Sequence, residues 1–107
     1  MKQDDLYILQ MAVTGQIKVG RSNDVARRLL QLQTGCPHRL HMILHAQGQG
    51  YREKAIHRLM GYRQIRSGGE WFTEEGLSEL PPDLYGLLDL TQQDWWRTRK
   101  ADNGTPE

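Results

Sequence analysis

The stretch LYILQMAVTGQIKVG, residues 6–20, decides the fold. Residues 6–13 are apolar and rich in side chains that favour strands, which predicts a central β-strand. Thr14-Gly15 is a turn signal. Residues 16–20 alternate polar and apolar side chains, as the second strand of a hairpin does.

Hydrophobic periodicity and turn residues divide the rest of the chain into short elements. The expected elements are a helix capped by residues 22–24 and carrying Val25, Leu29 and Leu32, a strand at 40–46, a helix at 51–62, a short helix near 73–80 and a last helix at 83–100. The stripe predicted to face the core from the helix at 51–62 comprises Tyr51, Ala55, Ile56, Leu59 and Met60.

These elements predict a small α/β domain with a mostly antiparallel three-stranded sheet flanked by helices. We place the domain at residues 1–80. Residues 81–107 are expected to form a helical extension and a disordered tail that pack on or next to the same domain.

Composition narrows the class of protein further. The chain has 107 residues, of which 37% are hydrophobic, so we expect one domain with a small core. It contains no apolar run of about 18 residues and no apolar block after its polar first residues, so neither a membrane span nor a signal peptide is expected. A single cysteine, Cys36, favours a reducing, cytoplasmic setting. The net charge of +1 excludes a uniformly basic surface but allows a local basic face.

Several motifs follow one another in an order that resembles the GIY-YIG nuclease superfamily. Leu6-Tyr7-Ile8 stands where that superfamily has Gly-Ile-Tyr, and Lys18-Val19-Gly20 stands where it has Tyr-Ile-Gly. The superfamily's arginine lies about eight residues after the glycine, which selects Arg28, and its glutamate corresponds to Glu53 on the following helix. The implied fold is a small GIY-YIG-like domain.

One subfamily is resembled more closely, the group named after an open reading frame of phage T5. The shared motifs are Lys-Val-Gly, the Glu-x-x-x-His of Glu53 and His57, and Gly-Glu-Trp-Phe at 69–72, and the resemblance covers roughly residues 5–74. Two positions depart from the superfamily pattern. Lys18 replaces the second tyrosine, and the late asparagine is missing, since asparagine occurs only at 23 and 103.

The resemblance implies a divalent-metal-dependent endonuclease or nickase that hydrolyses DNA with weak sequence specificity. It makes Glu53 the ligand of a single Mg²⁺ or Mn²⁺ ion and Arg28 a phosphate contact. Glu53 lies about 110° from the centre of its helix's apolar stripe, at a margin that can reach a cleft. The alternative for Glu53 is a glutamate favoured by the helix dipole. For Arg28 it is a solvated surface side chain.

Tyr7 and Lys18 lie on neighbouring strands. If the loop is Thr14-Gly15, Met11 faces Lys18, and Tyr7 lies about 13 Å further along the same face at roughly 3.3 Å per residue. A longer loop or a bulge would bring them closer. The resemblance makes Tyr7 a phenol that positions water or relays a proton, and Lys18 a general base or phosphate contact. A core tyrosine and an exposed lysine are the alternatives.

Further residues complete the candidate site. His57 follows Glu53 by one helical turn, so it can orient Glu53, contact phosphate or shuttle a proton, while a capping or core-edge histidine is the alternative. Glu70 is a possible auxiliary acid. The expected nucleic-acid contacts are Arg21, Arg27, Arg52, Arg58 and Arg63.

Other clusters carry less weight. Cys36, His38, His41 and His45 suggest zinc, but His41 and His45 would lie about 13 Å apart along one strand face shared with Ile43, too far for one ion. Residues 95–100, WWRTRK, suit stacking on unpaired bases. An amphipathic last helix explains them as well.

The partners follow from the function. We expect DNA, with a partner protein as a possible source of specificity, no membrane, and a monomer or transient dimer. A catalytically inactive nucleic-acid-binding module is the alternative, favoured by Lys18 and the missing asparagine. A protein-interaction domain is a third reading.

Overall fold

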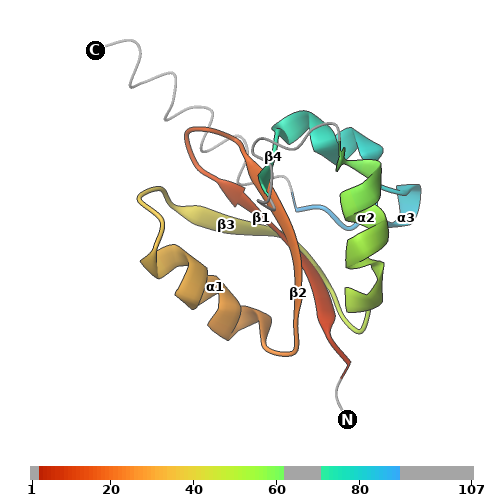
Figure 1. The fold of residues 1–107 in the computed structure, drawn as a ribbon, viewed down its shortest axis with the longest axis horizontal. Helices are drawn as coiled ribbons and strands as arrows, with labels where there is room; N and C mark the ends of the chain where they lie inside the picture. Colours follow the sequence, from red (N-terminus) through yellow and green to blue (C-terminus); the bar gives the residue numbers. More distant parts are fainter. Residues whose placement is uncertain (1–2, 62–70, 90–107) are drawn as a thin grey trace.

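The computed structural model describes residues 3–61 and 71–89, and within these ranges one antiparallel sheet has the strand order β3-β1-β2-β4 (Figure 1). The strands are β1 (Asp5–Met11), β2 (Ile17–Ser22), β3 (Leu40–Ala46) and β4 (Trp71–Phe72). The helical elements are α1 (Val25–Thr34), the 3₁₀ turn η1 (Gly50–Arg52), α2 (Glu53–Leu59), the 3₁₀ helix η3 (Glu74–Glu79) and α3 (Pro82–Tyr85). The α/β class is confirmed, and β4 adds a fourth strand to the three expected.

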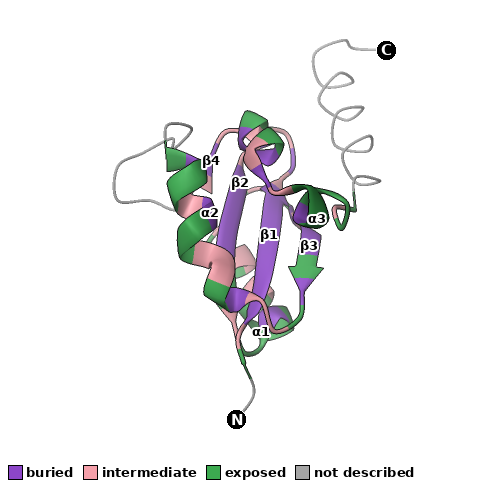
Figure 2. Ribbon diagram, turned by 90° about the vertical axis from the view of Figure 1, so that its right-hand side faces the viewer, coloured by how far each residue is buried: buried purple, intermediate pink, exposed green. Residues whose placement is uncertain are grey.

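The central strand β1 is buried on both faces, which places helices on both sides of the sheet. Leu6 and Ile8 face a core formed with α2, η3 and α3, whereas Tyr7 and Leu9 face α1. Figure 1 shows α1 and α2 on opposite sides of the strands, and Figure 2 shows β1 and β2 as the buried centre. Burying one such aliphatic side chain contributes about 1.5–3 kcal/mol to folding.

The first helix forms as its sequence predicts. The carboxylate of Asp24 accepts a hydrogen bond from the backbone N–H of Arg27 at 3.2 Å, which caps the helix N-terminus. Val25 is buried, and Leu29 and Leu32 pack against the same core. The strand expected at 40–46 is also confirmed.

The hairpin loop is longer than expected. Lys18 pairs with Leu9 and Gly20 pairs with Tyr7, so the pairing of Met11 with Lys18 expected for a Thr14-Gly15 loop is wrong, and the alternative of a longer loop is confirmed. Val13 and Gly15 take φ angles of 78° and 76°, and these left-handed residues widen the turn. Tyr7 and Lys18 thereby become diagonal neighbours on one face of the sheet.

A β-bulge in β3 separates the two histidines that were expected to share a face with Ile43. Ile8 pairs with Leu44 and Leu9 with Met42, so Ile43 is the extra residue. His45 then lies opposite Tyr7, and His41 lies opposite Gln10 on the other face. The expectation of a shared face is therefore wrong.

The later helices are shorter than the pattern indicates. Ile56 and Met60 are buried, but Leu59 is 45% and Tyr51 73% exposed, so the predicted stripe is too wide. Tyr51 lies in η1, whose three residues per turn do not follow the α-helical wheel. α3 ends at Tyr85, so a continuous helix over 83–100 is wrong, and residues 90–107 lie outside the described part of the chain.

In the described residues, no helix is both long and apolar enough to cross a bilayer.

We predict that Gly20→Ala destabilises the fold by about 1–3 kcal/mol, the usual cost of overpacking. A Cβ at Gly20 would lie 2.4 Å from the Tyr7 hydroxyl, so the ring has to move. Urea unfolding measures the change, with Gly35→Ala as the control because a Cβ there meets nothing within 4 Å. Equal stabilities of the two variants would contradict the close packing of Tyr7 on β2.

We also predict that stability falls as the pH drops below 6.5. Burial, with Arg39 nearby, lowers the pKa of His41 below its ordinary value of 6.5. The neutral form is thus favoured in the folded state, so the contribution is complete above the unfolded pKa and is lost as pH falls through the folded one. Unfolding at several pH values should show a shallower slope in His41→Gln than in the parent chain. An unchanged slope would exclude His41 as its source.

Candidate functional site

The predicted site residues converge on one short segment, residues 18–21 of β2. Tyr7 lies over Gly20 from β1, Lys18 belongs to the segment itself, and α2 brings Glu53 and His57 to it. α2 lies against the outer edge of β2, where His57 reaches the carbonyl of Val19. This edge is the candidate site.

His57 anchors α2 to β2. Its Nε2 lies 2.7 Å from the carbonyl oxygen of Val19, and because a carbonyl only accepts, Nε2 carries the hydrogen. The imidazole also packs on the ring of Phe72, with the centroids 5.4 Å apart. The hydrogen bond satisfies the backbone carbonyl of Val19 with a side chain from α2.

Glu53 lies one turn before His57, at the same edge. Its side chain is 18% exposed, and Oε1 lies 3.9 Å from Nε of Arg21. The same Nε lies 3.7 Å from the carboxylate of Asp4. Arg21 therefore lies near two carboxylates. Its guanidinium can also form hydrogen bonds with a phosphate.

Tyr7 and Lys18 are both buried on the α1 face of the sheet. Tyr7 is 2% and Lys18 7% exposed, so the alternative of an exposed strand lysine at position 18 is wrong. The Nζ of Lys18 lies 5.7 Å from the centre of the Trp71 ring, a cation–π arrangement. A charged group is thus held on the same face as the Tyr7 phenol.

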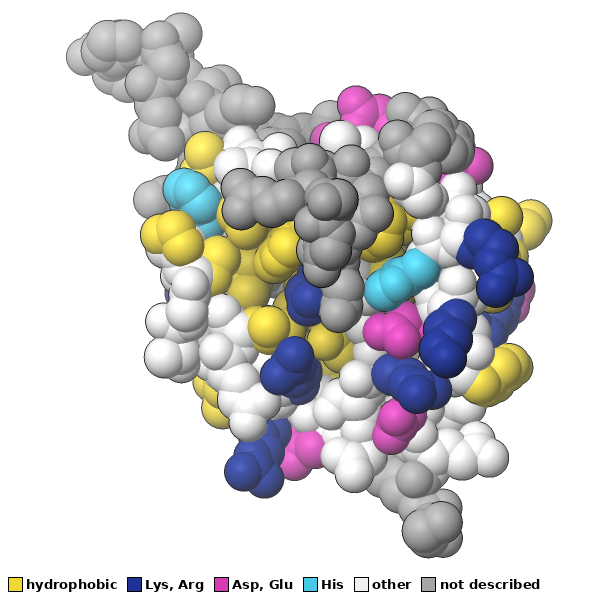
Figure 3. All heavy atoms as spheres, in the orientation of Figure 1, with side chains coloured by type: hydrophobic (Ala, Val, Ile, Leu, Met, Phe, Trp, Pro, Cys, Tyr) yellow, Lys and Arg dark blue, Asp and Glu magenta, His cyan; other side chains and the backbone are white. Residues whose placement is uncertain are grey.

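Arg27 and Arg28 lie on the exposed side of α1. Nη1 of Arg28 donates to Oε1 of Gln31 at 3.4 Å, three residues along the same helix. Figure 3, which shares the orientation of Figure 1, shows Lys and Arg side chains on both the α1 and α2 sides of a hydrophobic strip, and a histidine and acidic side chains are among those on the α2 side. The edge of β2 therefore lies between two basic margins.

The remaining predicted arginines differ in their surroundings. Arg52 donates to Asp83 at 2.7 Å, and this hydrogen bond raises the pKa of Arg52 and lowers that of Asp83. Arg52 is thus engaged within the protein, whereas Arg58 is exposed on α2. Arg63 and Glu70 lie outside the described residues.

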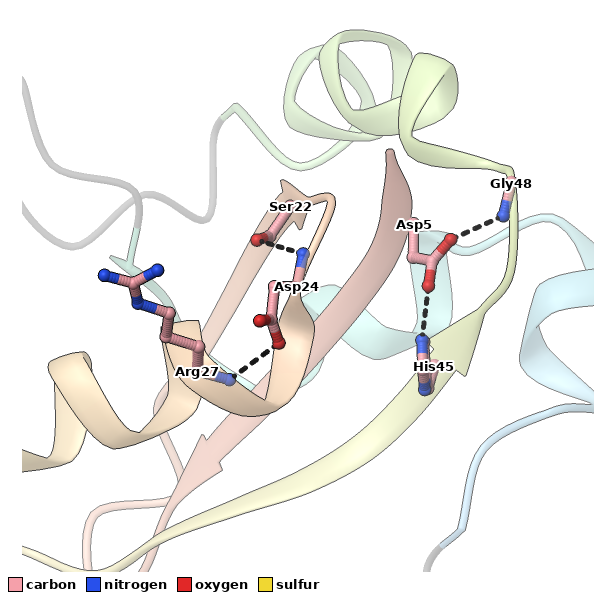
Figure 4. Close-up of polar contacts among 6 residues, drawn as sticks. All are labelled: Asp5, Ser22, Asp24, Arg27, His45 and Gly48. Carbon is pink, nitrogen blue, oxygen red and sulfur yellow. Dashed lines mark hydrogen bonds and ion pairs between the residues drawn. The ribbon is translucent and has the colours of Figure 1, made fainter. Parts of the chain in front are cut away.

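A second polar cluster lies near the start of β1 and was not predicted. Asp5 is buried, and its carboxylate contacts Nε2 of His45 at 2.8 Å and accepts from the N–H of Gly48 at 2.8 Å (Figure 4). The Asp24 cap and its Ser22 partner lie near this cluster, at the start of α1. A sequence separation of 40 residues gives no local signal for the Asp5–His45 pair.

The donor set fits a weakly held Mg²⁺ or Mn²⁺ rather than a caged metal. In the described residues, no group of three or more His, Cys, Asp or Glu side chains is placed to hold an ion. Mg²⁺ keeps most of its waters and often takes one or two carboxylates together with substrate phosphates. Glu53, partly exposed at the edge, suits that mode.

Comparison with known proteins identifies the family. The chain matches the T5orf172 domain over residues 6–83, well over half of its length, and therefore belongs to that family. The family is of a nuclease-associated, DNA-related type. No curated protein and no solved structure matches the chain.

We predict that His57→Ala destabilises the protein by about 1–3 kcal/mol, because the Val19 carbonyl loses its hydrogen-bond donor. Arg58→Ala, the exposed neighbour, should change stability by less than about 0.5 kcal/mol. Urea unfolding compares the two. Similar values for both variants would show that the hydrogen bond does not hold α2 in place.

Proposed function

We propose that the protein is a GIY-YIG-type endonuclease or nickase that hydrolyses DNA phosphodiester bonds with a divalent metal ion. The observation that carries the proposal is the convergence of Tyr7, Lys18 and Glu53 on residues 18–21 of β2, between two basic margins. Membership of a DNA-related family supports the same substrate.

Glu53 is the proposed ligand of Mg²⁺ or Mn²⁺, which would neutralise charge on the phosphoryl oxygens and on the leaving oxygen. Arg21 already contacts Glu53, so a phosphate that approaches this carboxylate also meets a guanidinium. Arg28 on α1 supplies a second guanidinium from the opposite margin.

The chain's own groups divide the remaining work. The Tyr7 phenol is the proposed group that positions the attacking water or relays its proton. Lys18, held beside Trp71, is the proposed cationic phosphate contact. The Nε2 hydrogen of His57 is committed to Val19, which favours a positioning role for His57 over a proton shuttle.

A second candidate is a nucleic-acid-binding module without cleavage. The absence of the superfamily's late asparagine and the 3.9 Å approach of Arg21 to Glu53 favour it, because a guanidinium competes with a metal ion for the carboxylate. The protein-interaction alternative rests on Trp95 and Trp96, which lie outside the described residues.

We predict that purified protein nicks supercoiled plasmid with Mg²⁺ or Mn²⁺ but not with EDTA, and that Glu53→Gln lowers the rate at least about 100-fold. The change removes the proposed ligand charge and keeps the side-chain shape. Glu75→Gln on η3 is the matched control and should keep the parent rate.

If the parent chain binds DNA in a salt-sensitive way but does not nick it, the nuclease proposal is wrong and the nucleic-acid-binding module is supported. If Glu53→Gln still nicks at the parent rate, Glu53 is not the metal ligand and the catalytic group does not lie on α2.

A further inference from the structure

A polar pocket adjoins the candidate site at the start of β1. It has a volume of about 450 Å³ and is lined by Gln3, Asp4, Arg21, Gly48 and Tyr51. Arg21 belongs both to this pocket and to the contact with Glu53 at 3.9 Å. A group bound in the pocket is therefore one side chain away from the proposed metal ligand.

The walls of the pocket are held by the fold. The N–H of Gly50 donates to the carbonyl of Asp4 at 2.9 Å, and the two backbones are so close that a Cβ at Gly50 would lie 2.7 Å from that of Asp4. On the next residue of β1, Asp5 binds Gly48 and His45. The loop after β3 is thus fixed against β1 before any ligand arrives, which lowers the entropic cost of binding.

Tyr51 is an aromatic side chain that the core does not use. It is 73% exposed although its neighbours in η1, Gly50 and Arg52, are buried and half-buried. A flat exposed ring beside a guanidinium is the combination on which single-stranded nucleic acids bind, because every base has a stacking face and every linkage a phosphate.

We propose that this pocket binds one unpaired nucleobase stacked on Tyr51, with Arg21 on the adjoining phosphate, so that the preferred substrate is DNA with an unpaired nucleotide beside the cleaved linkage. The inference rests on the proposed function, since the phosphate beside that base is the one presented to Glu53. A base in an intact duplex is paired and stacked on its neighbours, so it cannot offer its face to Tyr51 without being extruded.

The polar lining suits a base edge. The Asp4 carboxylate can accept hydrogen bonds from exocyclic amino groups, and the Gln3 amide both donates and accepts. Since Asp4 is held at its backbone by Gly50, these groups present a preformed surface to an incoming base.

The test measures binding apart from cleavage. Fluorescence anisotropy in EDTA compares a labelled 12-nucleotide single strand with the matched blunt duplex, for the full chain, Tyr51→Ala, Tyr51→Phe and the control Tyr85→Ala, an exposed tyrosine on α3 outside the pocket lining. We expect the full chain to bind the single strand more tightly than the duplex. Tyr51→Ala should weaken single-strand binding about tenfold or more, the effect of losing one stacked base. Tyr51→Phe and Tyr85→Ala should keep the parent affinity.

The outcomes separate the two proposals. If single-strand binding depends on Tyr51 but the protein does not nick plasmid, the proposal of a base-binding pocket stands and the nuclease proposal is wrong. Glu53-dependent nicking with Tyr51→Ala binding as tightly as the parent keeps the nuclease and overturns the pocket. Equal affinity for strand and duplex, or equal losses in Tyr51→Ala and Tyr85→Ala, also overturns the pocket.

Discussion

The hydrogen bond between His57 and the carbonyl of Val19 holds α2 against β2, and the geometry of the candidate site depends on it. Among the described residues, β4 pairs with Ile17 and Lys18 of β2. An unpaired backbone oxygen in this partly buried place is costly. The imidazole of His57 pairs with it at 2.7 Å, and the helix that carries this side chain brings Glu53 to the same edge one turn earlier. A requirement of backbone chemistry thus places an acidic side chain beside a strand that already carries Lys18 and lies under Tyr7.

On the α1 face of β2, the position of Tyr7 depends on a glycine, which has no side chain. Gly20 leaves room for the Tyr7 ring to cross from β1, with the phenol end where a Cβ would be. Gly50 acts in the same way at the start of β1, where it lets η1 approach the backbone of Asp4. Both glycines bring functional groups nearer than ordinary residues would allow. The Tyr7 phenol and the Tyr51 ring owe their places to these two close approaches.

Much of the fold follows from local pattern, and the exceptions have physical causes. The buried run in β1, the Asp24 cap and the strand from Leu40 to Ala46 are dictated by burial and capping close in sequence. The hairpin register depends on a left-handed Val13, a conformation that a β-branched residue rarely adopts and no motif announces. No sequence motif predicts the β-bulge at Ile43 either. In the site, the adjacency of Glu53 and His57 follows from helical spacing. The contacts Arg21–Glu53 and Asp5–His45 join segments 32 and 40 residues apart and exist only in the tertiary structure.

The short segment after Leu80 bears on where the independently folding unit stops. Leu84 is fully buried in the same core as Leu6 and Ile8, and the N–H of Asp89 donates to the carbonyl of Ile43, the bulged residue, at 2.8 Å. Asp83, through Arg52, also ties this segment to η1. A fragment cut after Leu80 would open a cavity the size of a leucine and lose a donor to the bulged strand. For protein production, a fragment that keeps the described core intact therefore has to run at least through Asp89, beyond the last residue of the family match.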